Sequence, residues 1–324
     1  MAYTVRDLLY EHPCNPVQTT WCQPDAPTSS KKASTCPCTL DQVRSTVVTD
    51  PDRALLPECP DDSLRCAQPA FPPNNRIWRL ETAGDCADWF KAEVSNVVLA
   101  AWTGFPTVTE ASYTELSSHT PTSHTAYELD YQNQRFPLVI GLWRRNIIRQ
   151  DEWIRGSLGN AQLKLTKELR VYANKYKCPQ VFCFDGEWLL LLQFRAGAPE
   201  MIKDENCKID CWLIPRVNDG RSWPLRYAFY RFLAQGFRRC QGVHFRYHPI
   251  PHEVGKLLPD PELEYFSGRL VWKVKGVEYD EHPIQFRREI DTTCGAFYWT
   301  HEAQSFLPVG SVLWDTMPLW DTEG

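Results

Sequence analysis

Hydrophobic and polar positions alternate most regularly between residues 125 and 194. Two strand-like runs, Thr125–Tyr131 and Phe136–Trp143, flank a polar turn, and a helical pattern follows over Gln162–Tyr172. Two further apolar runs, Gln180–Phe184 and Trp188–Phe194, are joined by an Asp-Gly pair that is typical of a hairpin turn. The pattern predicts strand, strand, helix and two more strands as one folding unit.

The flanking sequence predicts further elements. Apolar residues recur at helical spacing over Asp88–Trp102, and Gly104 and Pro106 then end the helix. The Ser/Thr-rich residues 107–124 favour a loop or a weak helix. The remaining predicted elements are a strand at 209–214, an aromatic and arginine-rich helix at 223–239, and strands at 268–274 and 296–299.

Composition separates the first part of the chain from the rest. Residues 1–75 hold 11 of the 25 prolines and six of the 13 cysteines, which favours a flexible Pro/Cys-rich tail. Within it, one short helix is predicted around Leu40–Val47. Residues 76–324 are predicted to form one α/β domain, with its core at about 88–215 and a C-terminal extension.

Charge and hydropathy limit the classes of partner. The net charge of −5 argues against a chain that binds polyanions over its whole surface, but it permits a local basic face. We find no apolar run long enough to span a bilayer and no apolar core of a secretory leader at the N-terminus. We therefore expect no membrane partner, an intracellular location (nuclear or cytoplasmic), and free thiols rather than disulfides or a zinc site.

Two regions are rich in basic residues. Residues 141–178 contain nine Lys or Arg against three acids, and residues 216–239 add six arginines against one acid, with aromatic residues between them. If the two regions share a face, they form a phosphate-binding surface; the alternative is a solvated helix surface. Glu93 is expected at a solvated helix position. His244, His248 and His252 are expected in a turn, because Pro249 and Pro251 interrupt the helix that would align them.

Three segments carry a resemblance to a known family. Arg135–Ile148, Glu168–Tyr172 and Cys178–Phe194 resemble fungal proteins with a PD-(D/E)XK nuclease-like domain, which are similar to restriction endonucleases. The resemblance implies a restriction-endonuclease-like α/β fold, in which helices flank a mixed sheet. It also implies an ancestral chemistry, the hydrolysis of phosphodiesters with a divalent cation.

The resemblance also implies a set of site residues. Asp130 takes the place of the family's first acid, and Glu168 and Tyr172 take the places of an acid and a tyrosine on the following helix. Arg144 stands where the family has a lysine. Asp130 and Glu168 are then the candidate ligands of Mg²⁺, a cation that prefers carboxylate oxygens. The catalytic set is Asp130, Glu168, Arg144 and Tyr172, and the nucleic-acid-binding set is Arg144, Arg145, Lys164 and Arg170.

The chain departs from the family pattern at its centre. Leu142 occupies the position of a metal-binding acid, and the guanidinium of Arg144 stays protonated, so it does not readily act as a base. Either Glu168 supplies the missing ligand from the helix, or hydrolysis is lost and the fold binds or scaffolds.

Two function classes therefore remain as the main alternatives, and a third is a minor one. The first is a nuclease-like protein that binds nucleic acid, with Mg²⁺ as cofactor only if it is active. The second is a non-catalytic accessory or scaffold protein, for which the resemblance suggests a fungal secondary-metabolite or effector context. It would hold a protein partner through the aromatic surface and the apolar tail at residues 313–320. An enzyme with an unrelated small-molecule pocket is the third.

Overall fold

The architecture is known for part of the chain. The computed structural model describes residues 3–18, 24–25, 43–45, 55, 58, 60–103, 107–116, 121–131, 134–204, 206–220, 222–244, 262–274, 277–279, 286–290, 297–301 and 313–314. The predicted histidine turn at His248 and His252 lies outside these residues, as does most of the apolar tail at 313–320.

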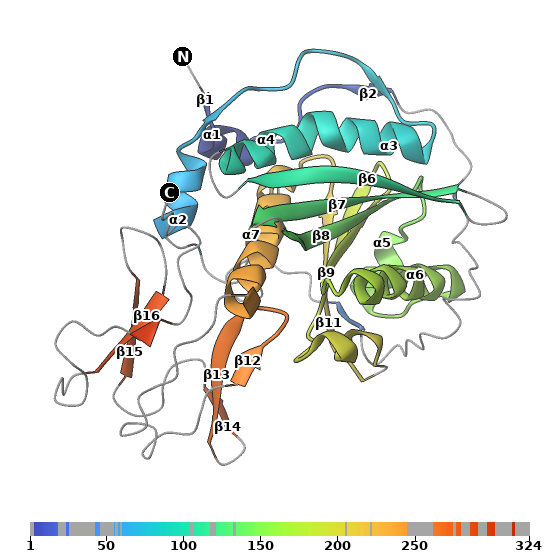
Figure 1. Ribbon diagram of the computed structural model, residues 1–324. Helices are drawn as coiled ribbons and strands as arrows, with labels where there is room; N and C mark the ends of the chain where they lie inside the picture. Colours follow the sequence, from blue (N-terminus) through green and yellow to red (C-terminus); the bar gives the residue numbers. More distant parts are fainter. Residues whose placement is uncertain are drawn as a thin grey trace.

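A seven-stranded mixed sheet forms the centre of the molecule (Figure 1). Its order is β3 (Val43–Ser45), β11 (Ile209–Pro215), β10 (Trp188–Phe194), β9 (Gln180–Phe184), β8 (Gln134–Trp143), β7 (Pro121–Tyr131) and β6 (Val108–Leu116). Strand β8 is parallel to β9, and β11 is parallel to β3, whereas the other neighbours are antiparallel. The prediction of an α/β fold with a mixed sheet flanked by helices is confirmed.

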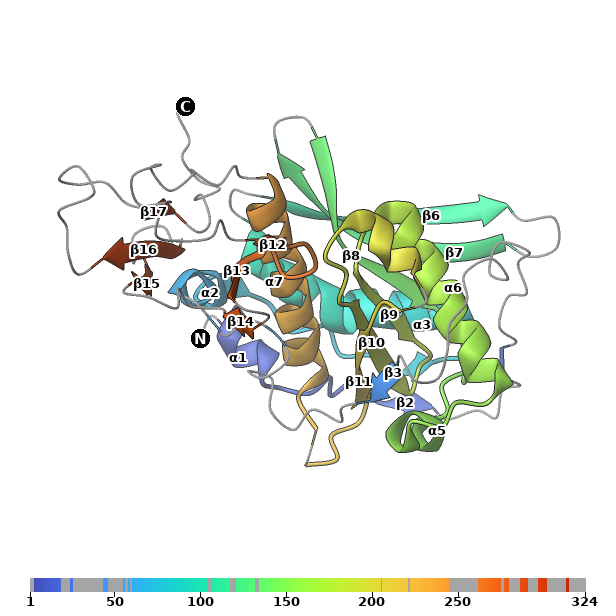
Figure 2. The same ribbon diagram turned by 90° about the horizontal axis from the view of Figure 1, so that it is seen from below.

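Helices cover both faces of this sheet. Successive side chains of β9 point to opposite faces, so Phe182 and Phe184 enter one apolar cluster and Val181 and Cys183 enter another. The first face carries α1 (Val5–Leu9), α2 (Pro60–Cys66), α3 (Ala83–Phe90), η4 (Lys91–Ser95), α4 (Asn96–Leu99), η5 (Ala100–Trp102) and α7 (Leu225–His244). The second face carries α5 (Gln150–Arg155), α6 (Asn160–Tyr176) and η6 (Pro199–Lys203). Figure 2 shows α7 and α6 on either side of the strands.

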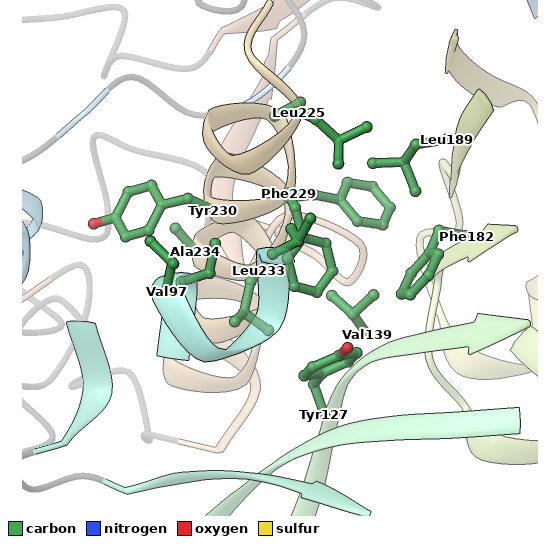
Figure 3. Packing of buried hydrophobic residues seen from close by; sticks show 14 of the residues in the cluster. Val97, Tyr127, Val139, Phe182, Leu189, Leu225, Phe229, Tyr230, Leu233 and Ala234 are labelled. Atoms are coloured by element: carbon green, nitrogen blue, oxygen red, sulfur yellow. The ribbon is translucent and has the colours of Figure 1, made fainter. Parts of the chain in front are cut away.

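Helix α7 packs closely against the sheet. The ring of Phe229 lies 5.0 Å from that of Tyr127 and 5.4 Å from that of Phe182, both edge to face (Figure 3). Gly236 lies directly against the backbone of Leu138 in β8, where a Cβ atom would overlap the carbonyl oxygen. A residue without a side chain is therefore required for this close approach.

The described part of residues 1–75 packs on the core, so the prediction of a flexible tail is wrong for these residues. Val5, Leu8 and Leu9 of α1 are buried, and Thr4 and Asp7 form a capping box that begins the helix. Strand β1 (Tyr3–Thr4) pairs with β4 (Pro69–Ala70), and β2 (Val17–Gln18) pairs with β5 (Trp78–Arg79). The i, i+3, i+4 spacing of three apolar residues outweighs the proline-rich composition around them.

Two further predictions are wrong, and several are confirmed. Residues 107–124 contribute strand β6 and the start of β7 instead of a loop or weak helix, because the β-branched threonines of this stretch suit an edge hairpin. Residues 43–45 form strand β3 instead of part of a helix. The predicted bounds of β9 and β10 are confirmed.

The C-terminal part contributes two small sheets. They consist of β12 (Glu262–Glu264), β13 (Arg269–Val274) and β14 (Val277–Tyr279), and of β15 (Phe286–Ile290), β16 (Phe297–His301) and β17 (Leu313–Trp314). The strands predicted at 268–274 and 296–299 correspond to β13 and β16. Among all the helices in the described ranges, none is both long and apolar enough to cross a membrane.

Candidate functional site

A buried ion pair lies where β8 ends. Arg144 follows β8, and its backbone N–H donates to Phe184 O at 3.1 Å, which continues the pairing with β9. Its guanidinium pairs with the carboxylate of Glu168 from α6 and donates to Trp143 O at 2.8 Å. Only 7% of Arg144 and 5% of Glu168 is exposed. The pair therefore joins the sheet to α6 and removes both charges from solvent.

Apolar side chains pack beside this pair. Leu142 lies on the same face of β8 and belongs to the cluster that contains Leu165 and Leu169 of α6. Glu168 Oε2 is buried and accepts no hydrogen bond. Glu168 is thus already compensated by a guanidinium, with a leucine beside it, and the nearby buried carboxylate of Asp185 accepts backbone hydrogen bonds instead.

Asp130 lies at the other end of β8. In the β7–β8 hairpin it stands opposite Arg135, with which it forms an ion pair of 3.3 Å, and Thr109 Oγ1 donates to it at 3.3 Å. Arg135 and Arg144 stand at opposite ends of the strand, about 30 Å apart at about 3.3 Å per residue. The predicted pairing of Asp130 with Glu168 at one metal ion is therefore wrong, because the hairpin carries the end of β7 away from the end of β8. In the part of the chain that the structure describes, no three His, Cys, Asp or Glu residues gather as a metal site.

Tyr172 belongs to an aromatic group around a histidine that the sequence reasoning missed. His124 of β7 stands opposite Leu142 in the strand register and is fully buried. Its ring lies 4.8 Å from the ring of Tyr172, and its Nε2 lies 2.5 Å from the hydroxyl of Tyr176. Tyr172 and Tyr176 are four residues apart on α6, so both reach the same histidine. This spacing is the feature of the sequence that could have predicted a shared partner for the two tyrosines.

A carboxylate lies beside this aromatic group. Tyr113 of β6 stacks on His124 at 5.5 Å and donates its hydroxyl to Glu128 at 3.2 Å. Burial and the neighbouring Glu128 carboxylate raise the pKa of Tyr113. The group ties the β6–β7 hairpin to α6.

Arg145 points away from Arg144, to the other face of the sheet. Its Nε donates to Leu80 O at 2.5 Å, and its guanidinium also contacts Asn146. The backbone of Arg145 exchanges two hydrogen bonds with Asp25, at 2.7 Å and 2.8 Å. Arg145 therefore holds together three segments that are distant in sequence.

Asp185 confirms the predicted hairpin turn. Its carboxylate accepts hydrogen bonds from the backbone N–H groups of Ile148, Glu187 and Trp188 at 2.8 Å, 3.0 Å and 2.9 Å. Burial raises the pKa of this carboxyl, and the three backbone donors oppose that effect. Glu187, at the edge of this turn, pairs with Arg216 at 3.4 Å.

The four residues predicted to bind nucleic acid do not form one face. Arg144 and Arg145 are buried on opposite faces of the sheet. Arg170 is fully buried, donates to Asp204 O and lies over the ring of Phe194 at 5.1 Å. Only Lys164, on α6, is exposed. The predicted shared surface is wrong because these guanidiniums satisfy internal carbonyls and carboxylates.

The arginines of α7 are internal as well. Both predicted alternatives, a phosphate-binding surface and a solvated helix surface, are therefore wrong for these residues. Arg226, Arg231, Arg238 and Arg239 are all buried. Arg238 pairs with Asp62 of α2, and Arg239 Nε donates to Gln180 at 2.8 Å.

Glu93 is likewise buried, which corrects the expected solvated position. Its Oε1 accepts hydrogen bonds from Asn15 Nδ2 at 2.7 Å and Trp78 Nε1 at 2.8 Å, and its Oε2 lies 3.9 Å from the guanidinium of Arg226. Glu93 thereby fastens the N-terminal residues to α7.

Helix α6 carries a group of exposed lysines. From residue 160 to residue 186, the charged residues that retain solvent exposure are lysines: Lys164, Lys167, Lys175 and Lys177. The other charged residues of this range, Glu168, Arg170 and Asp185, are buried.

No protein-family model, curated protein or solved structure matches this chain.

Proposed function

We propose that this protein is a nuclease-like protein that binds nucleic acid and does not hydrolyse it with a metal ion. The observation that carries the proposal is the buried pair of Arg144 and Glu168 beside Leu142. Mg²⁺ needs several oxygen ligands and retains waters. Here the Glu168 carboxylate is neutralised by a guanidinium whose departure would leave an uncompensated buried charge, and the neighbouring leucine offers no oxygen.

The order of elements supports the nuclease-like assignment. Strands β7 and β8 are followed by α6 and then by β9, which lies parallel to β8. Glu168 of α6 faces the end of β8, where the resemblance implies the family's site. This order and the position of Arg144 support our proposal of a restriction-endonuclease-like fold.

The lysines of α6 support binding. In a chain with a net charge of −5, they gather on one element, whereas Arg144, Arg145 and the arginines of α7 are internal. Lysines attract phosphates without a metal ion.

Hydrolysis and binding are separated by two measurements on the same samples. Calorimetry with Mg²⁺ and Mn²⁺ and a plasmid-nicking assay are expected to show neither metal binding nor nicking for the wild type. A labelled oligonucleotide is expected to bind with or without chelator, and more weakly as salt rises. Metal-dependent nicking that disappears in Glu168→Gln would refute the proposal.

A second candidate, the non-catalytic scaffold, is favoured by exposed apolar side chains near the N-terminus. Phe71 is 85% exposed and Ile77 is 65% exposed, and Tyr10 and Leu64 are exposed as well. Exposed aromatic and aliphatic side chains are typical of protein interfaces. The test is co-purification of a stoichiometric protein partner from the native cells. The partner is expected to be lost with Phe71→Ser and kept with a control substitution at the exposed Lys164.

A further inference from the structure

We propose that the outer face of α6 binds the phosphate backbone of a nucleic-acid duplex through a lysine stripe, defined as Lys164, Lys167 and Lys175. This inference deepens the proposed function and rests on it. It assigns binding to the exposed lysines of α6 and not to the buried Arg144–Glu168 pair.

The stripe follows from helical geometry. Lys167 and Lys175 lie three and eleven residues after Lys164, and at 3.6 residues per turn the three positions fall on one side of the helix. With a rise of about 1.5 Å per residue the stripe is about 16 Å long, or roughly five base-pair steps of 3.4 Å. Lys177 follows just beyond the helix. The stripe can therefore follow one backbone over about half a turn.

The charges of the stripe are not balanced by acids of its own helix. In α5, Arg155 pairs with Asp151 at 3.8 Å, in the i, i+4 arrangement that solvated helices often use. The only acid of α6 is Glu168, which is buried and paired with Arg144. An ordinary solvated helix face usually intersperses acids among its lysines, whereas α6 presents only positive charge.

The surface fits a duplex better than a single strand. Proteins that bind single strands combine basic residues with aromatic side chains on which bases stack. The residue between Lys167 and Lys175 on this face is Val171. The nearest tyrosine, Tyr176, has its hydroxyl against His124 and its ring under the Lys175 ammonium at 5.0 Å, so that ring is already occupied. A convex helix that carries only lysines reaches backbone phosphates without reading bases, so we infer binding without sequence preference.

The geometry also separates binding from the buried ion pair. Glu168 follows Lys164 by four residues, so it lies at the buried edge of the stripe, about 40° around the helix from Lys164, with 5% of its surface exposed and its carboxylate paired with Arg144. A duplex on the outer face therefore needs neither a metal ion nor the opening of the Arg144–Glu168 pair.

The test compares two variants with the same change of net charge. The first is K164E/K167E/K175E. The control is R6E/R76E/R79E, which reverses three exposed arginines at the N-terminal part of the chain, on the opposite side of the sheet. Circular dichroism melting establishes that both fold. Binding of a labelled 20-base-pair duplex and of one of its strands is measured by fluorescence anisotropy across a salt series.

The stripe variant is expected to bind the duplex at least tenfold more weakly than the wild type. The slope of the logarithm of the binding constant against the logarithm of salt concentration is expected to fall in magnitude by about two to three. Each phosphate that a lysine no longer neutralises reduces this slope by about 0.9. The control is expected to remain within a few-fold of the wild type.

Three outcomes would overturn the inference or the function beneath it. If both variants bind the duplex equally weakly, the loss is explained by net charge alone. If the stripe variant binds with wild-type affinity, the binding site lies elsewhere. Either result overturns the inference and leaves the proposed function standing. Tighter binding of the single strand would overturn the assignment to a duplex. A wild type that binds neither probe at low salt would refute the proposed function itself.

Discussion

The guanidinium of Arg144 at the end of β8 and the carboxylate of Glu168 on α6 form an ion pair that is almost completely buried. The two residues are 24 apart in sequence, and their contact fixes α6 on the sheet. Under the proposed nuclease-like assignment, the same contact occupies the place of the metal ion. The Arg144–Glu168 pair therefore accounts both for the docking of α6 on the sheet and for the proposed loss of hydrolysis.

Removing one partner of this pair is expected to destabilise the fold. Glu168→Gln leaves the guanidinium of Arg144 buried without its counter-charge, which costs about 3–5 kcal/mol of unfolding free energy. Urea unfolding measures the loss. Lys164→Gln on the exposed side of the same helix is the matched control, with an expected change below about 0.5 kcal/mol. A loss in Glu168→Gln no larger than in the control would contradict the assigned role of the pair.

Asp130 is expected to be dispensable. Its ion pair with Arg135 is exposed, and exposed pairs contribute roughly 0–1 kcal/mol. Asp130→Ala should therefore leave the urea midpoint, the calorimetric metal titration and duplex binding close to those of the wild type. Loss of metal binding in this variant alone would restore Asp130 as a metal ligand.

Gly236→Ala is expected to be strongly destabilising. The added methyl group overlaps Leu138 O of β8, so α7 must shift away from the sheet, and overpacking of this kind typically costs about 1–3 kcal/mol. Gly84→Ala in α3 is the control, since its nearest neighbour would be Thr82 Oγ1 at an ordinary 3.5 Å. In α3 alanine is favoured over glycine by up to about 1 kcal/mol, so the two thermal melts should shift in opposite directions.

Glu110 is expected to make stability depend on pH. Burial raises the pKa of its carboxyl, while hydrogen bonds from Lys91, Ser95 and Tyr127 partly oppose this. Because its pKa is higher in the folded chain than in the unfolded chain, the folded state binds more protons in that interval. Its contribution is therefore complete at low pH and is lost as pH rises above the ordinary glutamate value. Urea unfolding from pH 4 to 7 should show a smaller decline in Glu110→Gln than in the wild type; parallel curves would contradict this.

Local pattern was sufficient for the central elements. The apolar runs of β9 and β10 and the Asp-Gly turn between them have the predicted bounds, because their side chains are buried on both faces and the turn chemistry is local. The strand–strand–helix–strand order was readable for the same reason. Local pattern misled at residues 107–124, where polar β-branched residues form an edge hairpin, and at α1, whose three apolar residues stand in a proline-rich stretch.

The sequence by itself determined the central strands β9 and β10 and the turn between them, because their apolar pattern and turn chemistry are local. Tertiary structure alone decided which charges meet. The antiparallel β7–β8 hairpin sends Asp130 to the end of the strand opposite Arg144, and the fold buries Arg145, Arg170 and the arginines of α7 against internal oxygens. A buried guanidinium must be paired, and its partner is set by packing between distant segments, so a count of basic residues along the chain does not reveal which of them remain exposed.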